Sequence, residues 1–372
     1  MSPDFVPGKV LSRRFYHEVV GPLVRRRFPG LPHTAGLVDY GSDVLGYDDA
    51  MSRDHQWGPR LSVFLTASDL ATYGPALDQE LSGNLPREFL GYSTHFSDPG
   101  IDPIRRMESS SRGPVGHLVR IHSPGQFFLQ HLGWDPSTPP TVDHWLHFPQ
   151  QRLLTLARGE LFHDDLNLQG TREALAWYPK DGWVALMAVQ WQKIAEEEAF
   201  VGRTAGRGDE LGSRLVAARM VERMMRLSFL QRRTYFPYAK WFGTAFRGLE
   251  GIGELELTLQ RVVRARTGTS RQRYLGRAYQ LLGARQNALG LGPPVDLSLS
   301  PYYARPFPVI FAGRFADALG GQIEDPGWRL STKLGCLDQV TDQVALLENP
   351  PLARERIALV PPKQGELRDR PV

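Results

Sequence analysis

The residues whose types and spacing could do chemistry are concentrated in the stretch 40–65, YGSDVLGYDDAMSRDHQWGPRLSVFL. A glycine-serine pair, Gly41 and Ser42, follows the short apolar run 34–40. A glycine at the end of a strand allows the backbone to approach a ligand closely, and a serine hydroxyl beside exposed N–H groups suits a phosphate. The pattern therefore predicts a phosphate-binding turn at this pair.

Acidic residues in the same stretch precede a second apolar run, 60–65. Carboxylates two positions apart on a strand point to one face, where they can chelate a divalent cation that bridges phosphate oxygens during an in-line displacement. Asp54 could supply one such carboxylate, and the carbonyl of Gln56 can bind a cation without bringing charge. Asp48 and Asp49 could complete a metal site or form a solvated turn, and both interpretations stay open.

These residues resemble a known superfamily. A strand ending in Gly-Ser, followed by Asp-x-Asp on the next strand, resembles the nucleotidyltransferase fold of the polymerase beta superfamily, and YGS…SRDHQW is similar to the motif of kanamycin-type nucleotidyltransferases. The resemblance is closer to a bacterial branch, domain of unknown function 4037 (DUF4037). It covers residues 10–345, approximately, and rests on the stretches GSDVLGYDD, SRDHQWGPR, QWQKIAEEEAFVGR, GDELGSRLVAARMV, FPYAKWFGTAF and LGCLDQVTD.

The resemblance implies a small mixed sheet followed by a helical domain, with a nucleoside triphosphate and Mg²⁺ bound in the cleft between them. A hydroxyl of a small-molecule acceptor would attack the α-phosphorus and release pyrophosphate. Carried over by position, Gly41 and Ser42 hold the phosphates, Asp54 holds the metal, and Gln56 stands where a second carboxylate is expected. A third carboxylate is expected on a later strand, where the stretch HLVRIHS carries none.

In superfamily members with this arrangement, the helical domain can supply a catalytic base and a phosphate-binding cation. Glu197 or Glu198 could be that base, with Arg203 nearby as a phosphate ligand, but a solvated acidic run at a helix end is the simpler interpretation. Asp209 and Glu210 are the other candidates for the base. An N-cap followed by a first-turn acid also explains this second pair.

Two further cations could hold phosphates. Lys240 lies among the aromatic residues of YFPYAKW in a chain with only six lysines, and it could contact a triphosphate or be an exposed lysine beside an aromatic cluster. Arg60, just after the acids, could bind a phosphate or pair with Asp54. The run His-Asp-Asp at 163–165 could supply a base and ligands, or its acids could cap a turn.

The elements that must position these residues fall into two regions by their hydrophobic periodicity, a mixed region of strands and helices followed by a helical region. In residues 1–170 the periodicity predicts strands and helices together, at helical positions 11–27 (with Ser12 as a cap), 68–81, 123–132 and 145–158, and at strand positions 34–40, 60–65, 88–96, 117–122 and 160–163. Beyond residue 170 helical periods dominate, at 171–178, 181–200, 209–231, 253–265, 271–288 and 308–319.

The stretch 209–231 carries an apolar, methionine-rich stripe that we expect to pack in the core, through Leu211, Leu215, Ala218, Met225 and Phe229. The predicted fold class is α+β. We expect a nucleotidyltransferase-like α/β domain over residues 1–170, a mostly helical domain covering the cleft over 171–350, and a polar tail over 351–372.

Composition limits the class of protein. The net charge of +4 over 372 residues does not create the field expected of a nucleic-acid binder, so nucleic-acid substrates are not expected. The single cysteine, the lack of a long apolar run and the lack of a signal pattern indicate a cytoplasmic protein. The sequence has no GxxxxGK[ST], HExxH, CxxC or GxSxG motif, so P-loop ATPases, zinc proteases, thiol redox enzymes and serine hydrolases lack support.

Three hypotheses follow. The first is a Mg²⁺-dependent, nucleotidyltransferase-like enzyme acting on a nucleoside triphosphate and a small-molecule acceptor. The second is a fold whose metal site has decayed and which binds a nucleotide or small molecule without catalysis, as Gln56 and the missing third acid suggest. The third is a different biosynthetic reaction in the same cleft.

Overall fold

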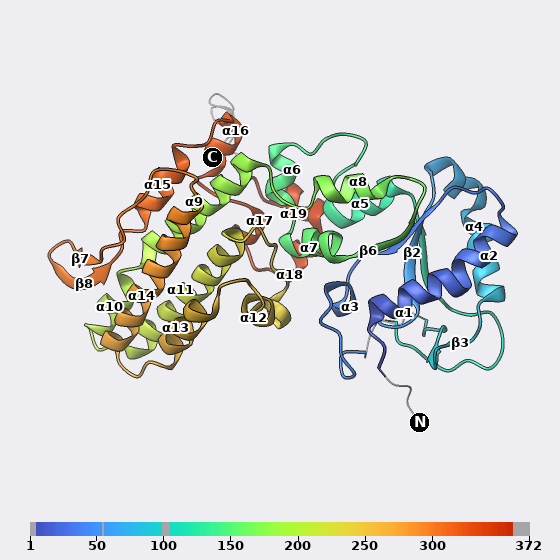
Figure 1. Cartoon of the computed structure of the whole chain (residues 1–372), viewed down its shortest axis with the longest axis horizontal. Coiled ribbons are helices and arrows are strands. Elements are labelled where there is room, and N and C mark those ends of the chain that lie inside the picture. Colours follow the sequence, from blue (N-terminus) through green and yellow to red (C-terminus); the bar gives the residue numbers. More distant parts are fainter. Residues whose placement is uncertain (1–4, 54–55, 99–104, 360–372) are drawn as a thin grey trace, which may run out of the picture. The chain divides into compact units, whose positions relative to one another are not determined.

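The computed structural model describes residues 5–53, 56–98 and 105–359. By their contacts these residues fall into two compact units (Figure 1). The sheet unit contains the described residues of 1–140 together with 152–176 and 349–351, and the helical unit contains 141–151, 177–348 and the described residues of 352–372. The chain therefore has the mixed α+β character that the sequence predicts.

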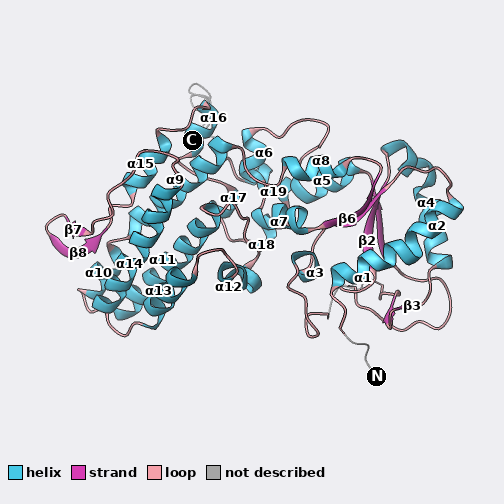
Figure 2. Ribbon diagram, viewed as in Figure 1, coloured by secondary structure: helices cyan, strands magenta, loops and turns pink. Residues whose placement is uncertain are grey.

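A small mixed sheet forms the centre of the sheet unit (Figure 2). Its strands are β1 (Thr34–Leu37), β2 (Arg60–Phe64), β5 (Leu118–His122) and β6 (Glu160–Asp164). Their order is β5-β2-β1-β6, with β1 antiparallel to β2 and to β6, and β2 parallel to β5. All four lie at positions where the sequence predicts strands.

Side chains alternate along these strands and separate an apolar face from a polar one. The apolar face packs against the helical segments α1 (Gly8–Phe15), η1 (Tyr16–Val20), α2 (Gly21–Arg27) and α4 (Ala67–Asn84). Their shared hydrophobic cluster includes Ala35, Leu61, Val63, Val119, Leu11, Phe15, Val24, Leu77 and Leu81. The opposite face of β2 and β5 carries Arg60, Ser62, Arg120 and His122, because Ser62 pairs with Arg120 and Phe64 with His122 in the parallel register. Burial of the apolar face fixes the register and so determines which side chains reach the polar face.

The first helix differs from the prediction. It begins at Gly8, directly after Pro7, so Ser12 lies inside it and does not cap it. The helix then continues without a break through a π-helical turn, and its parts are α1 (Gly8–Phe15), η1 (Tyr16–Val20) and α2 (Gly21–Arg27). Hydrophobic periodicity does not predict a π-helical turn, because the turn inserts a residue without changing the residue types.

Other elements of the sheet unit are shorter or shifted relative to the prediction. The expected strand 88–96 is a small hairpin, because Leu90 and Gly91 both have positive φ and turn the chain. The helix predicted over 68–81 begins one residue earlier, at Ala67, and Thr66 caps it. The remaining elements are α3 (Ser42–Leu45), α4 (Ala67–Asn84), β3 (Glu88–Phe89), β4 (Tyr92–Ser93), α5 (Pro124–Leu132) and α8 (Leu168–Ala174).

The helix expected over 145–158 is two helices, α6 (Val142–His147) and α7 (Gln150–Arg158). Phe148 is extended, with φ −68° and ψ 115°, and it precedes Pro149. A residue before proline disfavours α-helical backbone dihedral angles, which explains why the helix is interrupted at Phe148.

Helices dominate the helical unit, as predicted, with one small hairpin. Its elements include α9 (Lys180–Glu197), α10 (Phe200–Ala205), α11 (Glu210–Leu230), α12 (Ala239–Arg247), α13 (Gly253–Arg264), α14 (Gly268–Ala288), α15 (Gly313–Gly320), α16 (Pro326–Ser331), α17 (Leu337–Val340), α18 (Val344–Leu347), β7 (Ser300–Tyr302) and β8 (Arg305–Val309). A last helix, α19 (Pro350–Arg356), occupies the start of the segment that we expected to be a polar tail.

The buried stripe of α11 differs from the one that we expected. Val216, Met220 and Met224 are buried, whereas Leu211 and Leu215 are 71% and 60% exposed. Apolar residues occur on adjacent faces of this helix, and contacts with α9, α13 and α14 select one of them. Among the described helices, none combines the length and the apolar character that crossing a membrane requires.

Candidate functional site

The predicted Gly41–Ser42 turn lies just beyond the end of β1, at the start of α3. Gly41 has φ 120°, and a Cβ there would lie 2.2 Å from Oδ1 of Asp43 and 2.6 Å from Nη2 of Arg60. Conformation and close packing therefore both require glycine at this position. Ser42 is half-buried, and its hydroxyl makes no hydrogen bond within the part of the chain that the structure describes.

A buried ion pair lies behind the turn. Nη2 of Arg60 is 2.7 Å from Oδ1 of Asp43, and Nε donates to Oδ2 at 3.1 Å. Arg60 also donates to the carbonyl oxygen of Tyr40, and its side chain is only 5% exposed. In this structure Arg60 therefore holds the turn in place. Asp54, the other partner that the sequence suggested, lies outside the described residues.

A second ion pair, more exposed than the first, lies on the same face of the sheet. Arg120 on β5 forms a salt bridge with Asp39 and also donates to the hydroxyl of Tyr40. The Tyr40 ring lies 4.6 Å from the guanidinium carbon of Arg120 and 5.2 Å from that of Arg60. Burial raises the pKa of Tyr40 above its ordinary value, with the two arginines opposing that shift, so the hydroxyl remains protonated. Arg120 is the half-exposed cation of this group, at 36%.

Gln56 completes the group around Arg120. Its Oε1 accepts a hydrogen bond of 3.3 Å from Arg120, and its backbone, at φ 48°, donates to the carbonyl oxygen of Arg105 at 2.8 Å. Arg120 contacts the carboxylate of Asp39 and the amide oxygen of Gln56, the two side-chain oxygen groups of this cluster that could bind a cation. A guanidinium beside them repels a cation, so the described residues alone suit an anion better than Mg²⁺. A Mg²⁺ site would depend on Asp54.

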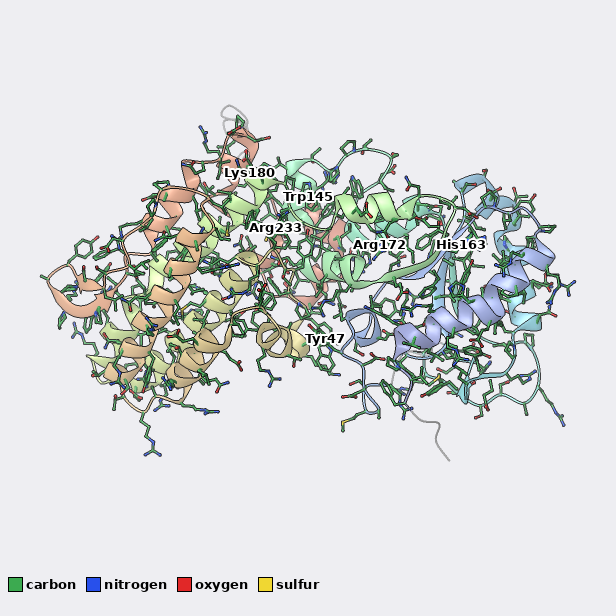
Figure 3. The ribbon with its side chains drawn as sticks, in the orientation of Figure 1. Tyr47, Trp145, His163, Arg172, Lys180 and Arg233 are labelled. Atoms are coloured by element: carbon green, nitrogen blue, oxygen red, sulfur yellow. The ribbon has the colours of Figure 1, made fainter. Side chains whose placement is uncertain are left out.

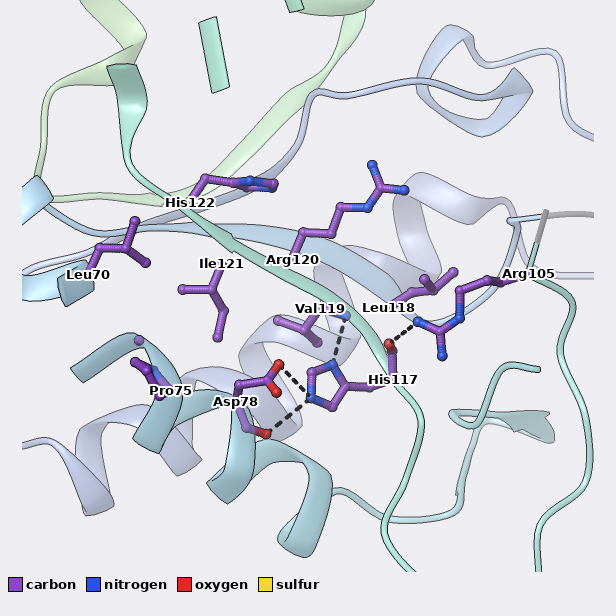
Figure 4. Close-up of a pocket in the computed structure, with 11 residues that line it drawn as sticks. Leu70, Pro75, Asp78, Arg105, His117, Leu118, Val119, Arg120, Ile121 and His122 are labelled. Atoms are coloured by element: carbon purple, nitrogen blue, oxygen red, sulfur yellow. Dashed lines mark hydrogen bonds and ion pairs between the residues drawn. The ribbon is translucent and has the colours of Figure 1, made fainter. Parts of the chain in front are cut away.

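A groove runs along β5 in the sheet unit and has Arg120 in its wall (Figure 4). Its volume is about 720 Å³, and it is lined by residues of α4, by Arg105 and by the whole of β5. Burial lowers the pKa of His117 and of His122 below the ordinary value, so both rings are neutral at pH 7. Nε2 of His122 is buried without a hydrogen-bond partner among the described residues. The groove therefore places hydrogen-bonding groups along β5, beside a half-exposed arginine.

The structure places the two loop acids in different roles. Oδ2 of Asp48 accepts from the backbone N–H of Gly8 at 2.7 Å and from Nε1 of Trp57 at 2.9 Å, which anchors the first helix. Oδ1 of Asp49 accepts from two backbone N–H groups, of Met51 and Ser52, at 2.9 and 2.8 Å. These contacts of Asp49 form an exposed turn, which is one of the two interpretations that the sequence left open.

Glu197 and Glu198, at the end of α9, also have different environments. Glu197 pairs with Arg219 at 2.7 Å and with Arg223 at 3.1 Å. The buried Glu198 accepts from the backbone N–H groups of Ile310 and Ala312, each at 3.1 Å. Burial raises the pKa of Glu198 to about 7.

The other candidates in the helical unit have structural contacts. Asp209 caps α11 through the N–H of Gly212 at 2.8 Å, and Glu210 forms a bidentate pair with the buried Arg271 at 2.8 and 2.6 Å. Arg203 and Lys240 are exposed and lie over the rings of Phe200 and Trp241, at 5.3 and 5.0 Å.

The structure thus brings together Gly41, Ser42, Arg60 and Gln56, and it adds residues that sequence reasoning missed. Asp39 and Asp43 flank the turn, and Arg120 comes from a distant strand. One sequence feature could have indicated Asp39 and Arg120, namely a charged residue within an otherwise apolar stretch, as in GLVDY and HLVRIHS. A charge in such a place needs a partner.

The family model described as "Domain of unknown function (DUF4037)" matches residues 145–242 of the chain, which supports the family resemblance. The matched stretch contains Glu197, Arg203, Asp209 and Lys240, whereas Gly41 lies outside it. Searches of curated proteins and of solved structures found no match to this chain.

Proposed function

We propose that this chain is a nucleotidyltransferase-like enzyme, which transfers a nucleotidyl group from a nucleoside triphosphate to a hydroxyl of a small-molecule acceptor. The observation that carries the proposal is the turn at Gly41. Only glycine fits there, and the next residue presents a hydroxyl that has no partner among the described residues. A turn of this kind at a strand end suits a phosphate.

The residues around the turn would act on the triphosphate. The hydroxyl of Ser42 would donate to a phosphate oxygen. Arg120 would exchange the carboxylate of Asp39 for phosphate oxygens, because a guanidinium fork fits both groups and this one is half-exposed. Arg60 would keep its place against Asp43 and hold the turn. The chain would thereby stabilise the negative charge that develops on the leaving pyrophosphate.

The remaining roles in the proposal belong to residues carried over from the resemblance. Asp54 would hold Mg²⁺, whose chemistry is to bridge and neutralise phosphate oxygens. The resemblance names Glu197, Asp209 or Glu210 as the base that takes the proton of the acceptor hydroxyl. The carboxylates of Glu197 and Glu210 would first have to release their arginine partners. Asp209 would have to release only the backbone N–H of Gly212.

The test measures binding and turnover in the full chain. ATP, GTP, CTP and UTP are each titrated by calorimetry with Mg²⁺, and pyrophosphate release is followed over a panel of hydroxyl-bearing small molecules. Ser42→Ala is expected to weaken nucleotide binding by about tenfold or more, because hydrogen bonds to charged groups are strong. Ser68→Ala on α4, an exposed serine, is the matched control and is expected to bind like wild type. Lack of binding by all four nucleotides would contradict the proposal.

A second candidate function is nucleotide or small-molecule binding without catalysis. The guanidinium of Arg120, 3.3 Å from Oε1 of Gln56, favours it, because a positive charge lies where a second metal carboxylate is expected. In this case a nucleotide would bind equally well with and without Mg²⁺, and no acceptor would release pyrophosphate. Magnesium-dependent turnover would exclude this second candidate.

A further inference from the structure

A cluster of two histidines and one aspartate lies where β6 pairs with β1, at the edge of the sheet opposite β5. His33 directly precedes β1, His163 lies on β6 (Figure 3), and Asp165 directly follows β6. The antiparallel register pairs Thr34 with Asp164, so His33 and Asp165 lie opposite each other. Two hydrogen bonds join them: the N–H of Asp165 donates to the carbonyl oxygen of His33 at 3.1 Å, and the N–H of His33 donates to the side-chain Oδ2 of Asp165 at 3.2 Å.

The side-chain donor atoms of the three residues converge. One ligand atom from each lies within 4.8 Å of the others. The two imidazole rings are 4.4 Å apart between centroids, and Nε2 of His163 lies 2.8 Å from Oδ2 of Asp165. Small side-chain rotations would bring such atoms to the roughly 2 Å bonds of a metal site.

The ring of His33 is oriented as in a metal ligand. Its Nδ1 lies 3.2 Å from the carbonyl oxygen of Leu31, so the ring proton sits on Nδ1 and is donated to that oxygen. Nε2 then carries the lone pair and accepts a hydrogen bond of 2.9 Å from the hydroxyl of Tyr16. Burial lowers the pKa of His33, so the ring is neutral at pH 7. Metal-ligating histidines are typically held in this way, with the second ring nitrogen donating to a backbone carbonyl.

We propose that His33, His163 and Asp165 bind one divalent transition-metal ion, namely Zn²⁺, through Nε2 of His33, a ring nitrogen of His163 and the carboxylate of Asp165. Two imidazoles and one carboxylate are a donor set that prefers Zn²⁺ or Co²⁺ over Mg²⁺ and Ca²⁺. Three protein ligands leave a further coordination position for water or a bound molecule. The proposed site shares no residue with the Mg²⁺ site that the resemblance implies at Asp54, and it does not depend on nucleotidyl transfer.

Tyr16 competes with the metal for His33. Tyr16 belongs to the π-helical turn η1, and its side chain is buried. Burial raises the pKa of Tyr16 to about 12, so its hydroxyl stays protonated. This hydroxyl donates to Nε2 of His33. A metal must displace this hydrogen bond. Tyr16→Phe removes the competitor and is expected to tighten Zn²⁺ binding by about two- to tenfold, which corresponds to the net strength of one hydrogen bond.

The test is calorimetric titration of the full chain with Zn²⁺ alone, repeated in excess Mg²⁺. We expect one Zn²⁺ per chain in both conditions. His163→Ala and Asp165→Asn are expected to weaken binding by at least about tenfold, since even residues that only orient ligands have effects of that size. His17→Ala removes an exposed histidine outside the cluster and is the matched control, with wild-type affinity expected. Ser42→Ala is also expected to bind Zn²⁺ like wild type.

Co²⁺ supplies an independent reading, because a four-coordinate Co²⁺ site absorbs visible light far more strongly than hydrated Co²⁺. Asp165→Asn preserves the shape of its side chain, so it remains informative if His163→Ala fails to fold. Absence of stoichiometric Zn²⁺ binding by wild type would overturn the proposal. Equal binding by wild type and Asp165→Asn would also overturn it, and the cluster would then be a hydrogen-bonded latch between β1 and β6.

Discussion

Two arginine–aspartate pairs beside the polar face of the sheet have similar chemistry and different surroundings. In the pair of Arg60 and Asp43 the side chains are 5% and 2% exposed, whereas in the pair of Arg120 and Asp39 they are 36% and 12% exposed. The buried pair is bidentate and also holds the carbonyl oxygen of Tyr40. The two pairs have the same residue types, so burial is what distinguishes Arg60, which maintains the turn, from Arg120, which can change partners.

The physical basis is the cost of a charge without its counterion. In the interior, removing one member of an ion pair leaves the other charge desolvated, which costs several kcal/mol. At the surface, water takes over the interaction and the loss is small. The following predictions test this contrast, beginning with the largest expected effect.

Arg60→Ala should lower the free energy of unfolding by about 3–5 kcal/mol, because it leaves the carboxylate of Asp43 buried without a partner. Urea denaturation measures the change. Arg13→Ala is the control, since Arg13 and Glu160 are 45% and 32% exposed, and its cost should stay below about 1 kcal/mol. Equal losses of stability for the two variants would contradict the role that we assign to burial.

Glu198 in the helical unit extends the contrast to a buried carboxylate that is held by backbone N–H groups and whose pKa is raised by burial from 4.5 to about 7. The fold favours its protonated form. Its stabilising contribution is therefore complete below pH 4.5 and is lost as the pH rises through 7, which amounts to about 3 kcal/mol. Urea denaturation from pH 4.5 to 8 measures this loss, and Glu198→Gln should flatten the profile. An unchanged slope in the variant would assign the pH dependence to other groups.

Gly41→Ala tests whether the buried pair and the turn form one unit. An alanine there would be strained at φ 120° and would meet Asp43 and Arg60, so the free energy of unfolding should fall by about 2–3 kcal/mol. Gly83→Ala, at an exposed helical position with open space around it, is the control and should be neutral or stabilising by up to about 1 kcal/mol. Thermal or urea unfolding measures both variants, and a neutral Gly41→Ala would contradict the close packing.

Arg120→Ala should cost less stability than Arg60→Ala, about 1–2 kcal/mol, because solvent already reaches this pair. Its main effect should be on nucleotide affinity, which we expect to fall by about tenfold or more with the loss of a charge-assisted contact. Calorimetry measures the affinity and urea denaturation the stability. Undiminished nucleotide binding would place Arg120 with Arg60 as a purely structural residue.

Local patterns predicted much of this molecule. Apolar runs bounded by turn residues located all four strands of the sheet, and Gly41-Ser42 located the turn. Strand order and side-chain pairing depend on contacts distant in sequence, so they escaped prediction. Asp39 and Arg120 are 81 positions apart, and no local signal joins them. The stripe on α11 was misplaced for the same reason, since the faces of neighbouring helices select the buried side.

The π-helical turn at Tyr16–Val20 has a consequence for the history of the chain. A π-helical turn holds one residue more than an α-helical turn, so a deletion of one codon here could restore an ordinary helix. The extra residue is absorbed within the turn, so side chains before and after such a deletion would keep their relative orientation about the helix axis. Leu11 and Phe15 would still face the same core as Val24. A deletion elsewhere in this helix would instead rotate the side chains on its two sides by about 100° relative to one another, so it should be tolerated less well than a deletion within the π-helical turn.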